Sequence, residues 1–521
     1  MPGTRAAAES EPLGLVAELP VAASLLALAM EAEWKLQQRL WGHAFHPMCS
    51  YLGSFPAALA HAFIARYSRP GDVVIDPFSG RGTVPLQACA ERRVGVGVDL
   101  NPLAHLLTEA KTDPPDGREV GARLDRLRIE WSCAGARWME LVPGATANPE
   151  QAVLPAPLGS GRLLEPLPAH VAGAFHRRTL AQLLFLRSTL DRKLPADRSL
   201  LGAAVGILHG SSASYLSTAM PNTFSLSPAY TRRGIEAREV PAPERDAFEL
   251  LGAKLRRLFR DGQPGQRGVS LGGDARDAGA RIRAALRSRG LPDRARLVVT
   301  SPPYLRLIRY GSYNWLRLWF LGHDPAEVDR ATTPPAGTVA YGAFLRETLT
   351  SLREVLTDDA VVVLVLGDVA TDRGRPRAPV AALAEQAWSL AAEPAGYRLA
   401  GVVADHVAAG RKLTRLWGAK AGRATVTDRL LVLGATEAGR RRALAGSATP
   451  VDWSHPARPK VPLPAAILPA YATDVSPGRS GLDGSAGPHE EPGPRPDDQP
   501  TALLRTPAAA APVRAGGQPG A

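Results

Sequence analysis

Cysteine is scarce in this chain. Only Cys49, Cys89 and Cys133 occur among its 521 residues. Their spacing forms no CxxC pair and no metal-binding cluster, and so few cysteines cannot build a disulfide framework. The sequence therefore excludes a disulfide-stabilised secreted scaffold, and it is typical of a protein from the reducing cytoplasm.

A hydrophobic run of membrane-spanning length is also missing from the sequence. The segment nearest to one, Leu19–Met30, is too short to cross a bilayer. Acidic residues rather than a basic cluster precede it, which argues against a secretory signal. We expect a soluble protein without a membrane partner, in which this segment begins a buried helix that runs to about Leu40.

Aromatic residues make up 6% of the chain, and none occurs from Ser476 onward. That last stretch is rich in glycine, proline, alanine and aspartate, so it cannot bury enough apolar surface to fold. We interpret it as a disordered tail.

Positive charge exceeds negative charge, with a formal net charge of +12. A basic chain suits a polyanionic partner, although arginines scattered over the surface would give the same total. Among the basic clusters we favour the loop 411–423, which also holds Trp417, for contact with nucleic acid. The other clusters are His176–Arg178, Arg232–Arg233 and Lys254–Arg257.

Short apolar runs bounded by turn residues alternate with helical patterns, and this alternation predicts a parallel sheet covered by helices. We expect strands at 72–76, 94–99, 269–271, 297–300, 360–366, 397–404 and 429–433. We expect helices at 55–64, 83–92, 102–111, 278–289, 313–321, 341–356 and 379–391.

Between residues 112 and 267 the alternation stops. A structureless loop of that length is improbable inside a compact domain, so this segment is expected to be an inserted, mostly helical module. The predicted organisation is an N-terminal extension (1–40), a cofactor-binding half (41–111), the insertion (112–267), a catalytic half (268–440), and a linker with the tail (441–521).

A glycine loop follows the first predicted strand, which ends at Asp76. Gly80 and Gly82 let backbone approach a ligand closely, and the next helix offers free N–H groups at its start. Asp99 ends the second strand, where an acidic residue binds ribose hydroxyls. Because the third glycine of a dinucleotide fingerprint is missing, the loop favours a smaller adenosine ligand. The alternative is an ordinary turn whose glycines serve packing alone.

The run Leu297–Thr300 predicts a buried strand that leads into Ser301–Tyr304, with the sequence SPPY. Two prolines fix the turn and lack N–H groups, so neighbouring carbonyls are not consumed by a ladder. The hydroxyl and a carbonyl can accept the hydrogens of a planar amine while the tyrosine ring stacks on it. An incidental surface turn is the alternative in a chain with 47 prolines.

These segments together resemble the amino-group DNA methyltransferases. Asp76–Thr83 (DPFSGRGT) resembles their S-adenosylmethionine loop, Gly97–Pro102 their ribose-binding strand end, and Gly273–Arg276 their adenine-contacting turn. Ser301–Tyr304 resembles their catalytic motif. His46–Pro47 and the following helix resemble the segment that closes over methionine.

The resemblance implies a class I S-adenosylmethionine-dependent methyltransferase fold, α/β, with a mostly parallel seven-stranded sheet whose last strand is antiparallel. It implies S-adenosyl-L-methionine as cofactor and no metal. The implied cofactor-binding residues are Asp76, Phe78, Gly80, Gly82, Thr83, Asp99, Asp274 and Ala275. The implied catalytic residues are Ser301, Pro302, Pro303 and Tyr304.

The chain departs from many SPPY relatives in two ways. Its cofactor loop precedes the SPPY turn, whereas many relatives are circular permutations, and the long insertion separates Asp99 from Asp274. Neither departure removes a site residue, but both leave the base-reading segment open, with the insertion as the candidate.

The implied substrate is double-stranded DNA with the target base flipped out, and Arg306 and Arg309 are suited to its phosphates. Serine in the first motif position resembles the N4-cytosine branch more than the N6-adenine branch, which stays the alternative. No cysteine follows a proline, so attack on cytosine C5 by such a cysteine is excluded.

An RNA guanine-N2 methyltransferase, a protein glutamine methyltransferase and a catalytically silent DNA-binding subunit are also compatible with the motifs. A restriction endonuclease is a candidate partner.

Overall fold

The computed structural model describes residues 27–142, 153–156, 164–220, 241–303, 309–367, 383–406 and 427–454, apart from 31 and 39. All of them belong to one compact unit, Met1–Ile467. Several predicted features lie outside the described residues: the start of the N-terminal helix, Tyr304, Arg306, Arg232–Arg233, the basic loop 411–423 and the tail.

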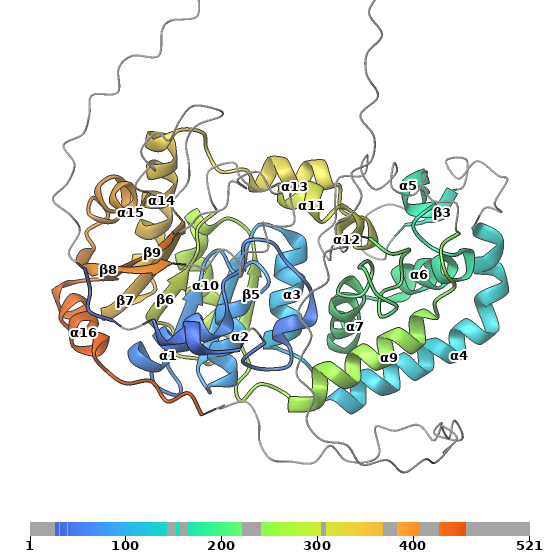
Figure 1. Cartoon of the computed structure of the whole chain (residues 1–521), viewed down its shortest axis with the longest axis horizontal. Coiled ribbons are helices and arrows are strands. Elements are labelled where there is room, and N and C mark those ends of the chain that lie inside the picture. The colour runs from blue at the N-terminus through green and yellow to red at the C-terminus, as the bar shows by residue number, and fades with distance from the viewer. Residues whose placement is uncertain are drawn as a thin grey trace, which may run out of the picture. The chain divides into compact units, whose positions relative to one another are not determined.

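A seven-stranded sheet forms the centre of the unit, with the order β5-β2-β1-β6-β7-β9-β8 (Figure 1). Neighbouring strands from β5 to β7 run parallel, while β9 is antiparallel to both β7 and β8. The expected sheet, with its last strand antiparallel, is therefore confirmed. The strands are β1 (Val73–Asp76), β2 (Val94–Asp99), β5 (Val269–Gly272), β6 (Ala295–Thr300), β7 (Leu356–Gly367), β8 (Arg398–His406) and β9 (Thr427–Gly434).

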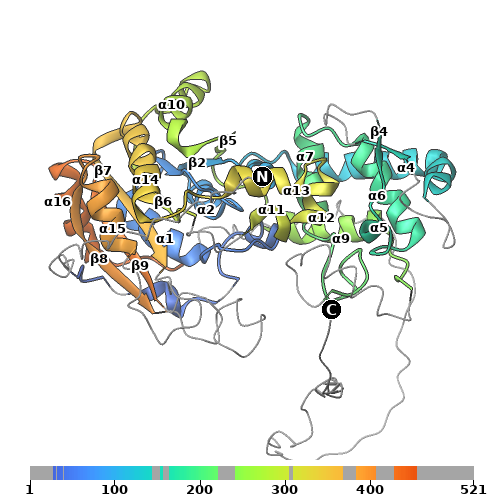
Figure 2. The ribbon, with the colours of Figure 1, turned by 90° about the horizontal axis from the view of Figure 1, so that it is seen from above.

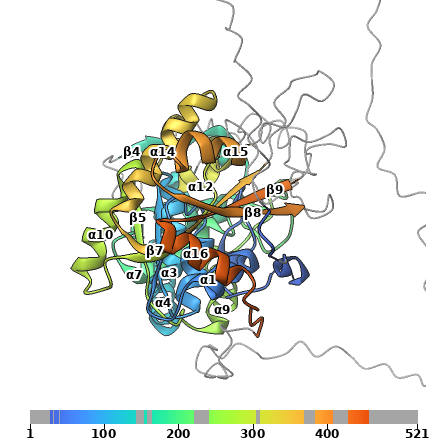
Figure 3. The ribbon, with the colours of Figure 1, turned by 90° about the vertical axis from the view of Figure 1, so that its left-hand side faces the viewer.

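Helices cover both faces of the sheet. One face packs against α10 (Ala278–Ser288), α14 (Thr338–Arg353), α15 (Leu383–Ala387) and the single-turn η6 (Trp388–Ala392). The other packs against α1 (Ala57–Tyr67), α2 (Thr83–Ala90) and α16 (Glu437–Ser447), with α3 (Pro102–Thr112) beside β2 and β5. Figure 3 shows α14 and α15 on one side of β8 and β9, and α16 and α1 on the other.

The alternating sequence of β2 explains how closely the helices approach. Its valines (94, 96 and 98) enter the core on the α10 side. Its glycines face α2, because a Cβ at Gly95 would lie 2.0 Å from the carbonyl oxygen of Pro85. Valine on one face and glycine on the other thus set the distance between α2 and the sheet.

The described part of the insertion is mostly helical (Figure 2). Its longest helix, α4, buries Val120, Leu124 and Leu127 at helical spacing against the other helices. The elements are α4 (Gly117–Leu141), β3 (Val153–Pro155), β4 (Leu164–Pro166), α5 (Ala169–Ala172), α6 (Arg177–Thr189), α7 (Pro195–Val205), α9 (Ala247–Leu258) and η4 (Phe259–Asp261).

The segment after the SPPY turn shares its core with this helical module. It forms α11 (Tyr310–Tyr313), α12 (Trp315–Phe320) and α13 (Pro325–Thr332). The buried guanidinium of Arg187 on α6 donates to the Trp319 carbonyl at 2.7 and 3.1 Å, lies over that indole ring, and pairs with Glu165. The helical module and the segment around α12 therefore share one continuous apolar core.

The helix expected at 313–321 is interrupted at Asn314. This residue leaves helical geometry (φ −112°, ψ 20°), donates to the Tyr310 carbonyl and accepts from Arg317. Asparagine side chains compete in this way with the helix ladder, which explains the break.

The predicted helix up to Leu40 is wrong for the described residues 27–40. Ala27 forms a bridge to Val402 of β8, and the one helical turn is η1 (Glu33–Leu36). Asp405 fixes this segment, because it accepts from the Trp34 indole at 2.9 Å and pairs with Lys35 at 2.8 Å. Leu28 and Trp34 of this segment do pack on the sheet, but the segment lies along the edge strand β8 and is not a helix.

The predicted boundary at residue 440 falls inside α16. Tyr67 of α1 donates its hydroxyl to the carbonyl of Ala443 at 2.9 Å, and Arg442 donates to the Tyr67 carbonyl at 2.8 Å. The helix thus belongs to the layer that covers β7 and β9.

Candidate cofactor and substrate pocket

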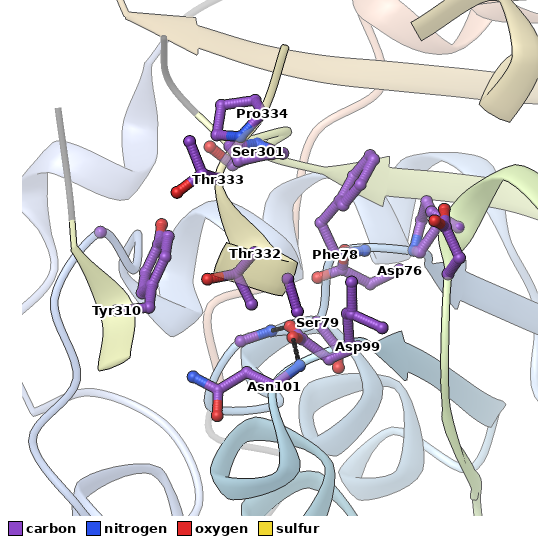
Figure 4. A pocket seen from close by; sticks show the side chains of 18 of the residues that line it. Asp76, Phe78, Ser79, Asp99, Asn101, Ser301, Tyr310, Thr332, Thr333 and Pro334 are labelled. Carbon is purple, nitrogen blue, oxygen red and sulfur yellow. Dashed lines mark hydrogen bonds between the residues drawn. The ribbon is translucent and has the colours of Figure 1, made fainter. Parts of the chain in front are cut away.

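A pocket of about 350 Å³ opens at the carboxyl ends of β1, β2, β5 and β6. The strand order reverses between β1 and β6, and ligands of open α/β sheets bind at such a point. Figure 4 shows side chains from several of these strand ends facing one cavity. Nine predicted site residues line it: Asp76, Phe78, Gly80, Thr83, Asp99, Asp274, Ala275, Ser301 and Pro303.

Three predicted site residues are not among the lining residues. Pro302 is buried beside the pocket, and Tyr304 lies outside the described part of the chain. Gly82 has φ +74°, and a Cβ there would lie 2.8 Å from the Thr108 hydroxyl. Gly82 therefore lets α3 pack against the loop rather than lining the cavity.

Backbone N–H groups hold the carboxylate of Asp99 at the end of β2. Gly80 donates to Oδ2 at 2.7 Å and Asn101 donates to Oδ1 at 2.8 Å. Burial raises the pKa of Asp99 to about 6, although these hydrogen bonds oppose the shift. The contact closes the loop 76–83 onto β2, so both segments face the same part of the pocket.

The other end of the loop is tied to α3. Lys111 is fully buried, and its side-chain nitrogen donates to the carbonyl of Arg81 at 2.6 Å. Burial is the main reason that the pKa of Lys111 is well below its usual value, and the charge of Arg81 adds to it. The loop is thus held between a carboxylate at Gly80 and an amine at Arg81.

Asp76 connects the cofactor loop to the strand that precedes SPPY. The Thr300 hydroxyl donates to its Oδ1 at 2.6 Å, and the Phe78 N–H donates to the same oxygen at 3.1 Å. Asp76 is buried, and burial raises its pKa to about 7. Ser301 follows Thr300 directly, so this contact sets the distance between the loop and the SPPY turn.

An acidic turn and two aromatic rings line another part of the cavity. Asp274 accepts from the Arg276 backbone at 2.9 Å and from its guanidinium at 2.7 Å. These contacts lower the pKa of Asp274. Phe78 and Phe344 face one another with ring centroids 5.7 Å apart. Flat apolar faces beside a hydrogen-bonding turn suit a purine base.

Sequence reasoning missed a second aromatic pair. Tyr51 and Tyr310 stack with centroids 5.8 Å apart and an interplanar angle of 20°, and both line the pocket. Asn101 donates to the Tyr51 hydroxyl at 2.9 Å. The resemblance around His46–Pro47 pointed toward this region, whose Phe55 also lines the cavity. Nothing in the sequence linked Tyr51 to Tyr310.

The end of α13 and the turn that follows it were also missed, although residues 330–335 line the pocket. In Figure 4, Thr333 and Pro334 lie beside Ser301, and the Tyr310 ring points toward the same region. The Pro334–Pro335 dipeptide is typical of a rigid turn, but no sequence pattern connects this turn with the site.

Some of the predicted basic clusters are occupied by structural contacts. Arg177 donates to the carbonyls of Met139 and Val142, and Arg178 pairs with Glu244 at 3.2 Å. Lys254 donates to the Pro47 carbonyl at 3.0 Å, which ties α9 to η2 (His46–Met48).

Within the ranges described, no group of three or more His, Cys, Asp or Glu side chains is arranged to hold a metal ion. No helix there has the length and apolar character to cross a membrane.

The loop geometry fits an adenosine ligand. Gly80 has φ +49°, and a Cβ there would stand 3.5 Å from the Tyr51 ring, which lines the same cavity. Asp99 and Asp274 supply acceptors, and the start of α2 supplies N–H groups. The pocket thus offers a loop that a ligand can approach closely, carboxylate acceptors and aromatic walls.

The strand order and the antiparallel β9 define a class I methyltransferase fold. Residues 34–109 match the family model described as DNA methylase, of the N6/N4 methyltransferase type. This segment, which carries Asp76, the glycine loop and Asp99, is thus similar to the amino-group DNA methyltransferases.

Curated relatives match the chain over short segments. It is 37% identical over 75 residues to the type II methyltransferase M.MjaII of Methanocaldococcus jannaschii, covering 14% of this chain and 13% of that protein. It is 42% identical over 53 residues to the type II methyltransferase M.Cfr9I of Citrobacter freundii, covering 10% and 18%. The matched segments thus span less than a fifth of either relative.

Among solved structures, the rRNA methyltransferase aviRa of Streptomyces viridochromogenes is matched with 14% identity and a TM-score of 0.26. That match covers 79% of this chain and 96% of the other.

Proposed function

We propose that this protein is an S-adenosylmethionine-dependent DNA methyltransferase that acts on the exocyclic amine of a flipped base, with cytosine N4 as the preferred acceptor. The observation that carries the proposal is the single cavity lined by Asp99 and Asp274 on one side and by Ser301 and Pro303 on another. A site suited to an adenosine ligand and a turn suited to an amine therefore line the same pocket.

The cofactor would be held by the loop and the two strand ends. Asp99 would accept the ribose hydroxyls, the turn Asp274–Ala275 would contact the adenine edge, and the packed rings of Phe78 and Phe344 would form an apolar wall beside the base. The N–H groups at the start of α2 suit the carboxylate of S-adenosylmethionine. S-adenosylmethionine would supply an already activated methyl group.

The acceptor amine needs its lone pair released from the aromatic ring. The Ser301 hydroxyl and a carbonyl beside Pro302 would accept the two amine hydrogens and favour a pyramidal nitrogen. The nitrogen would take the methyl group from the cofactor sulfur, which keeps the electrons of the broken bond, and would then pass one proton to water. The task of the site is therefore to position the nitrogen and to stabilise its transient positive charge. The turn thereby acts through acceptors, without a protein nucleophile.

Tyr304 would stack on the flipped base, a type of contact worth about 1–3 kcal/mol. A duplex base cannot reach a pocket at the end of a sheet, so extrusion of the base is part of the proposal. Stacking compensates for part of the unstacking energy and holds the amine near Ser301.

Serine at the first motif position supports cytosine N4, because it resembles that branch of the family. The chain should be expressed in a host free of DNA methylation, and the host DNA digested to nucleosides. N4-methylcytosine is the expected product, whereas 6-methyladenine alone would refute the base assignment. Single-molecule sequencing of the same DNA would give the recognition sequence.

Transfer of labelled methyl from the cofactor to DNA tests the activity itself. Ser301→Ala and Tyr304→Ala should both lower it strongly. Ser132→Ala is the matched control, because Ser132 is exposed on α4, where its hydroxyl contacts only its own helix and the neighbouring Cys133. Absence of labelling by the unmodified protein across many sequences would favour a silent DNA-binding subunit, and activity on RNA alone would overturn the DNA assignment.

A further inference from the structure

Three arginines line the pocket, and they differ in their partners. The guanidinium of Arg276 is bound to Asp274 at 2.7 Å and lies 3.7 Å from Glu347. Arg81 contacts the Thr83 hydroxyl at 3.4 Å. Arg330 is exposed, and it makes no hydrogen bond or ion pair with the residues that the structure describes. The guanidinium of Arg330 thus lies at the pocket, and the described residues accept none of its hydrogen bonds.

The helix that carries Arg330 is held firmly. The neighbouring Asp329 accepts from the backbone N–H groups of Gly311 at 2.7 Å and Ser312 at 3.1 Å. This fastens α13 to α11, which contributes Tyr310 to the pocket. The two helices are so close that a Cβ at Gly311 would lie 1.9 Å from the Pro325 carbonyl oxygen.

The turn that follows Arg330 borders the SPPY side of the cavity. The hydroxyls of Thr332 and Thr333 donate to helix carbonyls at 2.7 and 2.6 Å, which fixes the turn before Pro334. Thr333 and Pro334 lie beside Ser301 in Figure 4. Arg330 therefore belongs to the rim near the turn where the acceptor base would react.

We propose that Arg330 binds a phosphate oxygen of the target strand next to the flipped nucleotide. This inference rests on the proposed DNA methyltransferase function. A guanidinium offers a planar fork of donors that matches phosphate oxygens, and its charge needs no burial to act. Because a flipped nucleotide turns about its backbone, its phosphates stay at the mouth of the pocket, where Arg330 is exposed.

The carboxylate of the cofactor is the other anion that an arginine at this pocket could meet. Its partners, the N–H groups of α2, lie at the loop that follows β1, whereas Arg330 follows α11–α12 in the segment that shares a core with the helical module. The position of Arg330 at the pocket and its exposure favour the DNA phosphate. A phosphate contact would fix the register of the strand without reading its sequence.

Arg330→Gln removes the charge, and Arg330→Lys retains it. Arg441→Gln is the matched control, because Arg441 is an exposed arginine on α16. That helix follows β9, which runs antiparallel to β7 from Asp428 opposite Gly367 to Gly434 opposite Val361. Because β9 thus runs away from the carboxyl end of β7, α16 begins on the side of the sheet away from the pocket. Thermal unfolding of each variant checks that the fold is intact.

Binding is measured with a labelled DNA duplex that contains one mismatched cytosine, since a mismatched base is flipped more easily. The slope of the logarithm of the association constant against the logarithm of the salt concentration is negative. It is expected to become shallower by about 0.9 for Arg330→Gln, the loss of one phosphate contact. Arg330→Lys and Arg441→Gln should keep the slope of the unmodified protein. The dissociation constant for S-adenosylmethionine should be the same in all four proteins.

An unchanged slope in Arg330→Gln would overturn the inference. Weaker S-adenosylmethionine binding with an unchanged slope would do so too, and would assign Arg330 to the cofactor carboxylate. Methyl transfer to DNA by the unmodified protein is measured in parallel. Its absence together with a reduced slope would refute the proposed function and leave the phosphate contact standing, whereas normal transfer with an unchanged slope would refute the contact alone.

Discussion

The Thr300 hydroxyl donates a 2.6 Å hydrogen bond to the buried carboxylate of Asp76. This contact joins the last residue of β6 to the last residue of β1, two strands that lie side by side in the sheet but far apart in the sequence. The residue after Thr300 begins the SPPY turn, and the residue after Asp76 begins the cofactor loop. One hydrogen bond thus couples the positions of the two halves of the pocket.

Thr300→Val should lower both stability and methyl transfer. The substitution keeps the shape of the side chain but removes the shorter of the two hydrogen bonds to Oδ1 of Asp76, and the Phe78 N–H at 3.1 Å remains, so we expect a loss of about 1–3 kcal/mol. Thr112→Val is the control, because the buried Thr112 hydroxyl only donates to a helix carbonyl, that of Thr108. Urea unfolding and labelled-methyl transfer measure the two effects. Equal changes of stability and of methyl transfer in the two variants would contradict the coupling between the two halves of the pocket.

Stability should fall as pH rises through the range of the raised carboxyl pKa values. Burial raises the pKa of Asp76 to about 7 and that of Asp99 to about 6, whereas an unfolded aspartate titrates near 4. The folded protein therefore holds extra protons above pH 4. The corresponding stability is fully present below that pH and is lost as pH rises through 6 to 7.

Asp76→Asn removes the titration of one of these groups. In urea unfolding between pH 5 and 8, the stability of the unmodified protein relative to Asp76→Asn should decrease with pH. The limit for one group is about 1.4 kcal/mol per pH unit. A difference that stays constant over this range would show that Asp76 does not titrate there.

Gly311→Ala should separate cofactor binding from DNA methylation. A Cβ would collide with the Pro325 carbonyl, so α11 and α13 must move apart, at a cost of about 1–3 kcal/mol. We expect methyl transfer to fall while the affinity for S-adenosylmethionine is retained, because Tyr310 and Arg330 shift together. Loss of cofactor binding as well would contradict this division.

Gly121→Ala is the comparison for the previous variant. Gly121 lies within α4, and a Cβ there would meet no atom within 4 Å. The substitution should stabilise the helix by about 0.5–1 kcal/mol and leave methyl transfer unchanged. Thermal unfolding of both glycine variants measures the contrast.

Arg187→Met should be strongly destabilising. Arg187 is buried, and its removal leaves Glu165 without its ionic partner and takes the guanidinium donors from the Trp319 carbonyl, a loss of about 3–5 kcal/mol. The double variant Arg187→Met/Glu165→Met should recover much of that stability. If the double variant is less stable than Arg187→Met, the unpaired carboxylate is not the cause.

The sequence was most informative where local pattern and fold agree. The residues 94–99 alternate valine and glycine, and β2 occupies that range because both faces are used, one for the core and one for α2. Asp76, Gly80 and Asp99 were also found from the sequence, since strand–loop–helix geometry places them at the carboxyl ends of neighbouring strands.

Features that depend on distant contacts were not predictable. The apolar run before Leu40 was interpreted as a helix because composition does not separate a helix from a segment that covers a sheet edge. That choice is made by Val402 and Asp405. Tyr51 and Tyr310 stack although 259 positions separate them in the printed sequence. Such a pairing has no periodicity, so the second aromatic wall of the pocket was missed.

The shared core of α6, α7 and α12 has a consequence for evolution and for engineering. Trp315 and Phe320 are buried among residues of the helical module, although the chain returns to them only after β5 and β6. Exchange of residues 112–267 alone between relatives would strip these side chains of their partners. The structural unit is therefore discontinuous, and a chimaera must transfer the segment around α12 together with the module.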